Sequence, residues 1–508
     1  MKPSPAARQP VARPEALADR QKTMVGVVDI GSNSLRLVIY DRLSRSPIVL
    51  FNEKVMCALG RGLDTTGRLN PEGVALARDN LERFVLLTRR LGVQRLDVIA
   101  TAAIRDAADG PAFVAEIEER CRIRIRVIAG REEGRLAALG IQAGIPEARG
   151  ICGDLGGGSL ELAVAGADSG PVDSLPIGPL RMVQESGDMA GPRAHVDAQL
   201  RTLTWLSCGA GKPFYAVGGT WRALARIHME QEDYPLHIIQ NYAISRAQAE
   251  SFLELITQQS RKSLEKLVGI SRRRLETIPI AAYVLYRLLR LIQPSGIVFS
   301  AYGLREGHLL QQLDRKEQAR DPLITGAAQL AEADPRFGGG GDELLRWSRS
   351  LFPDQPPAQQ RLAHAAALLS DIAWSEHPDY RCEHAYTRAL RMPVPGIDHA
   401  GRVFIAVTLH ARYGGAPDDP LLARVRGLIG PEDFTRARAL GQAFRLAYTL
   451  TGGAPDLLGE THLTQDSDAL RLTVPEHTAI YTGDAAQRRL EALARTLNRR
   501  ALVRTNGR

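Results

Sequence analysis

Two short stretches of the sequence repeat each other and carry residue types that can hold a phosphate beside a metal ion. Residues 29–37 read DIGSNSLRL and residues 154–162 read DLGGGSLEL, and each follows an apolar run. In both, a turn of glycine, serine or asparagine precedes alternating apolar residues typical of a returning strand. Glycine lets an anionic oxygen approach backbone N–H groups, serine adds a donor, and the aspartate can bind a divalent cation. The repeat therefore predicts two matched phosphate-binding turns at hairpin tips.

An ordinary glycine-rich hairpin is the alternative for either stretch taken alone. Single glycine-rich motifs occur often without a bound phosphate. Turn formation by itself does not explain why aspartate, glycine, serine and two leucines recur in register. The pair therefore favours a functional site.

The repeat resembles the two phosphate motifs of the actin, sugar kinase and heat-shock ATPase superfamily. Within it, the sequence is similar to the exopolyphosphatase / guanosine pentaphosphate phosphohydrolase family. Four ordered motifs carry this resemblance, at residues 28–38, 98–107, 128–136 and 153–162, with weaker ones at 216–222 and 299–307. The resemblance implies an α/β fold of two actin-like (ribonuclease H-like) subdomains that flank a cleft. An all-α HD-like domain and a small C-terminal α/β piece are expected to follow.

The expected boundaries follow from the composition and from this resemblance. They are a disordered leader (1–23), subdomain I (24–146), subdomain II (147–320), the HD-like domain (321–455) and the C-terminal piece (456–508). Alternating strand and helix patterns support the α/β units, and amphipathic helices replace strands after residue 320. True HD phosphohydrolases bind metal with a His-Asp pair, but this position reads Ser370-Asp371. We therefore expect the helical domain to bind polymer or to support a dimer instead of holding a second metal.

Hydrolysis of a phosphoanhydride needs a holder for the terminal phosphoryl group, a cation, and a base that orients water. The two turns supply the holder and the cation site. The predicted phosphate-binding residues are Gly31, Ser32, Asn33, Ser34, Arg36, Gly156, Gly157, Gly158 and Ser159. The predicted ligands of Mg2+, or of Mn2+ in its place, are Asp29, Asp154 and Glu161.

The resemblance supplies the remaining roles. The family's general base lies at the position of Glu133, although a carboxylate at a helix start also suits the helix dipole, as Glu132 would. Successive helical residues point about 100° apart, so only one of the two can face the cleft. Arg105 matches a family arginine that meets the incoming phosphate chain, with a surface ion pair to Asp106 as the alternative. Gly134 departs from the alanine that is usual in the family.

Composition narrows the class of partner. The 508 residues carry a net charge of +8, and the pI near 9.3 favours an anionic ligand. Only 5% of residues are aromatic and no recognition-helix or RNP pattern occurs, which argues against DNA or RNA. No apolar run reaches the ~20 residues of a membrane span, and the leader lacks the apolar segment of a secretory signal. Scattered cysteines without a Cys-x-x-Cys pair indicate free thiols and a cytoplasmic location.

These features predict a metal-dependent exopolyphosphatase that releases orthophosphate from the end of inorganic polyphosphate, expected as a homodimer. A guanosine pentaphosphate 5′-phosphohydrolase is the alternative, because it also attacks a terminal phosphoryl group. An actin-superfamily kinase or a polyphosphate or alarmone sensor is less favoured, since the base and the metal ligands are all present. A polymer track is also predicted, with a solvated basic face as the alternative. Its residues are Arg272–Arg274, Arg488, Arg489, Arg495, Arg499 and Arg500.

Overall fold

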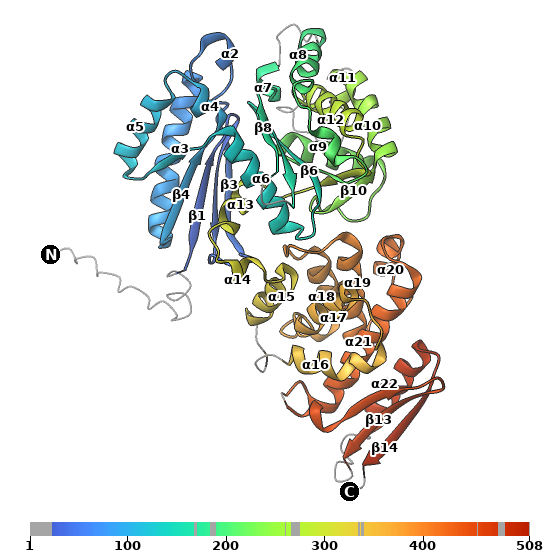
Figure 1. Ribbon diagram of the computed structural model, residues 1–508. Helices are drawn as coiled ribbons and strands as arrows, with labels where there is room; N and C mark the ends of the chain where they lie inside the picture. The colour runs from blue at the N-terminus through green and yellow to red at the C-terminus, as the bar shows by residue number, and fades with distance from the viewer. Residues whose placement is uncertain are drawn as a thin grey trace, which may run out of the picture.

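The computed structural model describes residues 23–166, 170–182, 189–259, 261–265, 275–333, 336, 340–454, 456–475 and 483–506. Residues 1–22 of the predicted leader and Arg272–Arg274 of the predicted track lie outside these ranges. No helix within them is long and apolar enough to cross a membrane. Figure 1 shows two sheets next to each other, a helical region below them, and a small sheet near the C-terminus.

The first sheet has five strands in the order β3-β2-β1-β4-β5. β2 runs antiparallel to β1 and β3, whereas β1, β4 and β5 are parallel to one another. The strands are β1 (Val25–Ile30), β2 (Ser34–Tyr40), β3 (Val49–Met56), β4 (Arg95–Ala100) and β5 (Ile125–Val127).

Helices cover both faces of this sheet. On one face Leu81 of α3 (Pro71–Leu91) and Ile117 of α5 (Gly110–Cys121) are buried against the strands. Pro71 suits the first turn of α3 because its φ is fixed, and Gly92 ends the helix in the left-handed conformation. On the other face lie α6 (Gly130–Gly144) and α13 (Leu304–Leu310).

The second sheet repeats the connectivity of the first. Its order is β10-β11-β9-β6-β7-β8, so β6, β7, β8, β9 and β11 take the places of β1 to β5 with the same relative directions. The strands are β6 (Gly150–Leu155), β7 (Leu160–Ala165), β8 (Val172–Leu175), β9 (Phe214–Val217), β10 (Tyr242–Ser245) and β11 (Gly296–Phe299). Its outer face packs against α8 (Ala190–Leu200), α9 (Gly219–Gln231), α10 (Arg246–Gln258) and α12 (Ile278–Ile292). The predicted mixed α/β arrangement with two sheets is confirmed.

Helix α6 is shared by the two sheets. Its Leu136 lies in the core of the first sheet, and its Ile141 lies in the core of the second. A side chain at Gly140 would begin 2.0 Å from the carbonyl oxygen of Gly303, and one at Gly307 would begin 1.8 Å from that of Leu136. The glycines therefore allow α6 and α13 to cross closely between the sheets (Figure 1). This places the first turn of α6 where both sheets end.

A helical region follows, as predicted. It contains α15 (Pro322–Glu332), α16 (Gly341–Ser348), α17 (Pro357–Leu368), α18 (Arg381–Arg391), α19 (His399–Arg412), α20 (Pro420–Val425) and α21 (Pro431–Thr451). It contacts the second sheet's unit through Tyr234 Oη, 2.7 Å from His399 Nδ1, and through the Gly396 N–H, which donates to the Gly144 carbonyl at 2.8 Å. The chain ends in a sheet of β12 (His462–Gln465), β13 (Ala469–Pro475) and β14 (Arg500–Asn506), with α22 (Asp484–Thr496) packed on it.

The similarity of the helical region to an HD-like domain stays a prediction. At the position of the missing His-Asp pair, Ser370 Oγ lies 2.8 Å from Tyr448 Oη. Arg412 Nη2 donates to Asp371 Oδ1 at 3.0 Å. A guanidinium thus already neutralises the carboxylate that would have to bind a metal.

Candidate active site

The two repeated stretches form hairpin tips with the same geometry. In β1–β2, Asp29 is paired with Arg36, and in β6–β7, Asp154 is paired with Glu161. The turns also close with equivalent bonds, because the N–H groups of Gly31 and Gly156 donate to the carbonyls three residues later, each at 3.0 Å. The sequence repeat is therefore a structural repeat, with Arg36 and Glu161 in matching places.

The two tips lie against each other across the gap between the sheets. A methyl group at Gly158 would begin 2.7 Å from Ser32 Oγ, and one at Gly157 would begin 3.3 Å from the Asn33 Cβ. Glycine is required here for close approach, not for an unusual φ. Ser32 and Ser159 are both buried between the turns.

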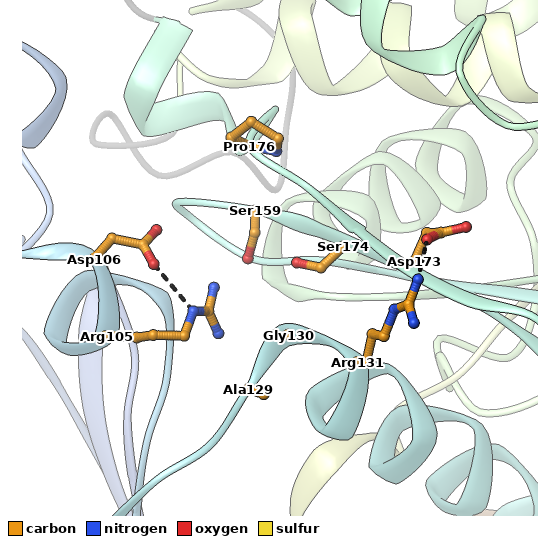
Figure 2. Close-up of a pocket in the computed structure, with 9 residues that line it drawn as sticks. All are labelled: Arg105, Asp106, Ala129, Gly130, Arg131, Ser159, Asp173, Ser174 and Pro176. Atoms are coloured by element: carbon orange, nitrogen blue, oxygen red, sulfur yellow. Dashed lines mark hydrogen bonds and ion pairs between the residues drawn. The ribbon is translucent and has the colours of Figure 1, made fainter.

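A pocket of about 510 Å³ opens beside these tips (Figure 2). Its walls come from α4 (Ala102–Asp106), from the start of α6, from the second tip and from β8. Its lining residues are Arg105, Asp106, Ala129, Gly130, Arg131, Ser159, Asp173, Ser174 and Pro176. Of the predicted phosphate-binding residues, Arg105 and Ser159 line this pocket. The predicted residues of the first tip and Gly156–Gly158 are not among its lining residues. Arg36 Nε donates to Asn52 Oδ1 at 2.9 Å.

Glu133 is buried in the first turn of α6, with only 7% of its surface exposed. Burial raises its pKa well above the ordinary value, and the carboxylates of Glu161 and Asp154 raise it further. Arg105 opposes this increase in pKa, since its Nη1 lies 3.4 Å from Glu133 Oε2. Glu132 instead pairs with Arg126 at 3.2 Å and is partly exposed. The structure thus directs Glu133, and not Glu132, toward the other carboxylates.

Burial also disfavours the ionised forms of Asp154 and Glu161. Burial raises the pKa of Asp154 to about 6, with Arg222 opposing the shift and Asp29 adding to it. Burial likewise raises the pKa of Glu161 to about 7. Glu161 Oε1 accepts from Ser174 Oγ at 2.8 Å, whereas its buried Oε2 has no hydrogen-bond partner among the described residues. Buried carboxylates with an open oxygen favour a bound cation.

The carboxylates do not form a complete metal site by themselves. Among the described residues, no three His, Cys, Asp or Glu side chains are placed to hold one ion together. The open oxygen of Glu161 and the buried Asp154 nevertheless fit Mg2+, which proteins often hold with one or two carboxylates, substrate phosphate oxygens and water.

Arg105 forms the ion pair with Asp106 that the sequence offered as the alternative, and it also lines the pocket. Its Nε lies 3.0 Å from Asp106 Oδ1, and its Nη1 reaches Glu133 and the Ile128 carbonyl. The ion pair with Asp106 therefore does not remove Arg105 from the site. It fixes the guanidinium at the pocket wall (Figure 2).

Comparison with known proteins agrees with this geometry. A model described as the Ppx/GppA phosphatase family matches residues 27–316, and one described as "Exopolyphosphatase, C-terminal" matches residues 323–503. The chain belongs to the Ppx/GppA phosphatase family.

The relatives of this phosphatase carry different names. Exopolyphosphatase 1 of Mycobacterium tuberculosis is 26% identical over 307 residues, which are 57% of this chain and 88% of that protein. The guanosine-5'-triphosphate,3'-diphosphate pyrophosphatase of Photobacterium profundum is 23% identical over 409 residues, which are 76% of this chain and 80% of that protein. A solved exopolyphosphatase structure from Cytophaga hutchinsonii, 23% identical, aligns with a TM-score of 0.52 over 57% of this chain and 98% of that chain, which supports the shared fold.

Two arginines of this Ppx/GppA phosphatase site were missed in the sequence. Arg305 of α13 is buried, and its Nη1 lies 3.0 Å from Asp29 Oδ2. Burial acts to lower the pKa of Arg305, but Glu306 and Asp29 outweigh it and raise the pKa. Arg222 of α9 donates from Nη1 to the Ala301 carbonyl at 3.0 Å. Its charge opposes the rise in the pKa of Asp154 that burial causes. Both lie in the weaker motifs at 216–222 and 299–307, which were the only signal for them.

The structure also explains the departure at Gly134. A side chain there would begin 2.7 Å from Val172 Cγ1 and 3.4 Å from the Cβ of Glu161. An alanine side chain would clash with Val172 of β8, next to the candidate metal ligand Glu161. Glycine therefore allows α6 to approach the sheet.

Proposed function

We propose that this chain is an exopolyphosphatase that hydrolytically releases orthophosphate from the end of inorganic polyphosphate, with Mg2+ bound. The observation that carries the proposal is the position of Glu133. It is a buried carboxylate beside two matched phosphate-binding tips, and Arg105 extends from it to the pocket wall.

The two tips hold the terminal phosphoryl group. Backbone N–H groups at 32–34 and 157–159 and the hydroxyls of Ser32 and Ser159 donate to its oxygens. Arg105 binds the same group or the next one from the pocket side. Asp154 and Glu161, together with substrate oxygens, would hold Mg2+, which would neutralise charge on the phosphate when bound. Asp29, the third predicted ligand, is instead paired with Arg305 at 3.0 Å.

Glu133 then acts on a water molecule aligned with the terminal phosphorus. The water oxygen forms a bond to phosphorus, the bridging P–O bond breaks, and Glu133 accepts the proton of the water. The products are orthophosphate and a polyphosphate shorter by one residue. The proton passes from Glu133 to solvent before the next cycle.

Guanosine pentaphosphate 5′-phosphohydrolase is the second candidate. It is supported by the relative from Photobacterium profundum, whose similarity extends over more of this chain than that of the mycobacterial exopolyphosphatase. The net charge of +8 and the C-terminal family match favour the polymer. Phosphate release from long polyphosphate, guanosine pentaphosphate and ATP, measured side by side with Mg2+, separates these functions from each other and from a kinase-like nucleotide site.

A polymer-binding role for the C-terminal half belongs to the same proposal. Burial lowers the pKa of Arg489 on α22, and the neighbouring cations Arg445 of α21 and Arg412 of α19 lower it further. Clustered guanidinium groups of this kind favour a polyanion. Of the predicted track, Arg489 joins this cluster, whereas Arg499 donates to the Asp466 carbonyl and Arg500 pairs with Asp468. The homodimer and the cytoplasmic location stay predictions.

A further inference from the structure

Arg181 joins the two halves of the site. It lies on α7 (Pro179–Met182), which follows β8 of the second sheet. Its Nη1 is 2.8 Å from Asp64 Oδ1 on α2 (Leu63–Thr66), and its Nη2 bonds Asp106 at the end of α4. Both carboxylates belong to the unit of the first sheet. One guanidinium therefore spans the gap between the units.

The backbone around Arg181 is fixed to the second phosphate-binding tip. The Leu180 N–H donates to the Gly157 carbonyl at 2.9 Å. A side chain at Gly178 would begin 2.4 Å from the Gly157 oxygen and 2.3 Å from the Gly158 carbonyl carbon. Any movement of Arg181 toward or away from the first unit is therefore transmitted to the 156–159 turn.

Asp106 connects this bridge to the pocket. Its Oδ2 accepts a hydrogen bond from Nη2 of Arg181, and its Oδ1 lies 3.0 Å from Nε of Arg105. Arg105 in turn reaches Glu133 at 3.4 Å. A continuous series of charged contacts thus runs from α7 through Asp106 and Arg105 to the candidate base.

We infer that Arg181 and Asp106 are positioning residues, which hold the two tips together and orient Arg105 toward the terminal phosphate. This inference rests on the proposed hydrolysis for its kinetic consequences. Neither residue needs to touch the reacting atoms, since Arg181 acts through Asp106 and Asp106 acts through Arg105.

An ordinary surface ion pair is the competing explanation. Exposed pairs contribute little to stability and impose little geometry. The Arg181 side chain is only 13% exposed, and its Nε is buried without a hydrogen-bond partner among the described residues. A guanidinium that two carboxylates from another unit hold in this way has little freedom to reorient.

A double-mutant cycle on the full-length protein tests the inference. Arg181→Gln should lower kcat for phosphate release about 10- to 100-fold, because misplacing a binding group by an ångström costs this much. In an Arg105→Gln background the same change should cost less than about threefold, since its effect passes through Arg105. Arg181→Lys, which keeps the charge, should recover part of the loss. Arg78→Gln, which breaks the remote Arg78–Glu116 pair, is the matched control and should leave kcat unchanged.

Equal losses in the two backgrounds would overturn the inference, and so would wild-type kcat in Arg181→Gln. If Arg181→Gln does not fold, Asp64→Asn can replace it in the cycle, because it removes one of the two bridging bonds. The effect of Asp64→Asn on kcat should likewise be smaller in the Arg105→Gln background than in the wild type. Small-angle scattering gives a readout that needs no substrate, because Arg181→Gln should widen the gap and increase the radius of gyration. An unchanged radius would count against the bridge. If the wild type releases phosphate from none of the three substrates, the proposed function fails while the scattering result still decides the bridge.

Discussion

The guanidinium of Arg105 lies 3.4 Å from the carboxylate of Glu133, at the point where the two halves of the molecule meet. The arginine comes from α4 of the first unit, and the glutamate comes from the helix shared by both sheets. A cation that contacts both the pocket and the candidate base can bind substrate and oppose the rise in the pKa of that base. The first prediction follows from this pair.

Glu133→Gln keeps the shape of the side chain but cannot accept a proton. We expect kcat to fall about 10²- to 10⁴-fold, with substrate affinity preserved. Steady-state phosphate release and equilibrium binding of polyphosphate measure the two effects. Glu132→Gln is the matched control, because Glu132 faces Arg126 instead, and it should retain turnover. The reverse pattern would assign the base to Glu132.

The metal prediction concerns Asp154 and Glu161. Changing either to alanine removes a ligand or a group that orients one, so the Mg2+ concentration for half-maximal activity should rise and kcat should fall. Titrations of phosphate release against Mg2+ provide the measurement. Curves that superimpose on the wild type would place both carboxylates outside the metal site.

Glu161 should also make the metal-free protein less stable at neutral pH. Its pKa is raised from 4.5 to about 7 in the fold, so the folded state binds the proton more tightly than the unfolded chain does. Stability contributed by this group is present below pH 4.5 and is lost as the pH rises to about 7. At pH 8 the free energy of unfolding of Glu161→Gln should therefore exceed that of the wild type by roughly 1–3 kcal/mol. The variant should accordingly unfold at a higher temperature.

The same comparison at pH 4.5 should show little difference between the two proteins, because wild-type Glu161 is then protonated in the fold. Thermal melts in EDTA at both pH values test this. A stability gap that is equal at the two pH values would show that Glu161 is not held against its charge.

The close approach of the two tips gives a steric prediction. The Cβ added by Gly158→Ala would lie 2.7 Å from Ser32 Oγ. The tips must therefore separate, or Ser32 must rotate away from the phosphate. We expect kcat/KM to fall about tenfold or more. Gly427→Ala, where nothing lies within 4 Å, is the control and should keep wild-type activity. Wild-type kcat/KM in Gly158→Ala would mean that the tips do not both bind the substrate.

The repeat at 29–37 and 154–162 was sufficient to predict two equivalent hairpins, because hairpin tips are encoded locally by glycine, serine and alternating apolar residues. Two α/β units and the helical C-terminal region were also predicted, from strand and helix patterns and from the resemblance to a family, whereas the order of the strands was not. The third sheet was only partly predicted, since β14 pairs with β13 across α22 and β12 is only four residues long.

Long-range contacts could not be derived from the sequence. Arg305 and Asp29 are separated by most of the first two units, and they meet because glycines allow α6 and α13 to cross. The bridge from Arg181 to Asp64 and Asp106 depends in the same way on how the two units pack. Local spacing contains no signal for such pairs.

Phosphate release by the purified wild-type chain with Mg2+ is the direct measurement of exopolyphosphatase activity. Long-chain polyphosphate, guanosine pentaphosphate and ATP should be compared at equal concentrations of terminal phosphoryl groups. We expect stepwise release of orthophosphate from polyphosphate, with a kcat/KM higher than that for either nucleotide. Higher kcat/KM for guanosine pentaphosphate, or release from none of the three substrates, would contradict the proposed function.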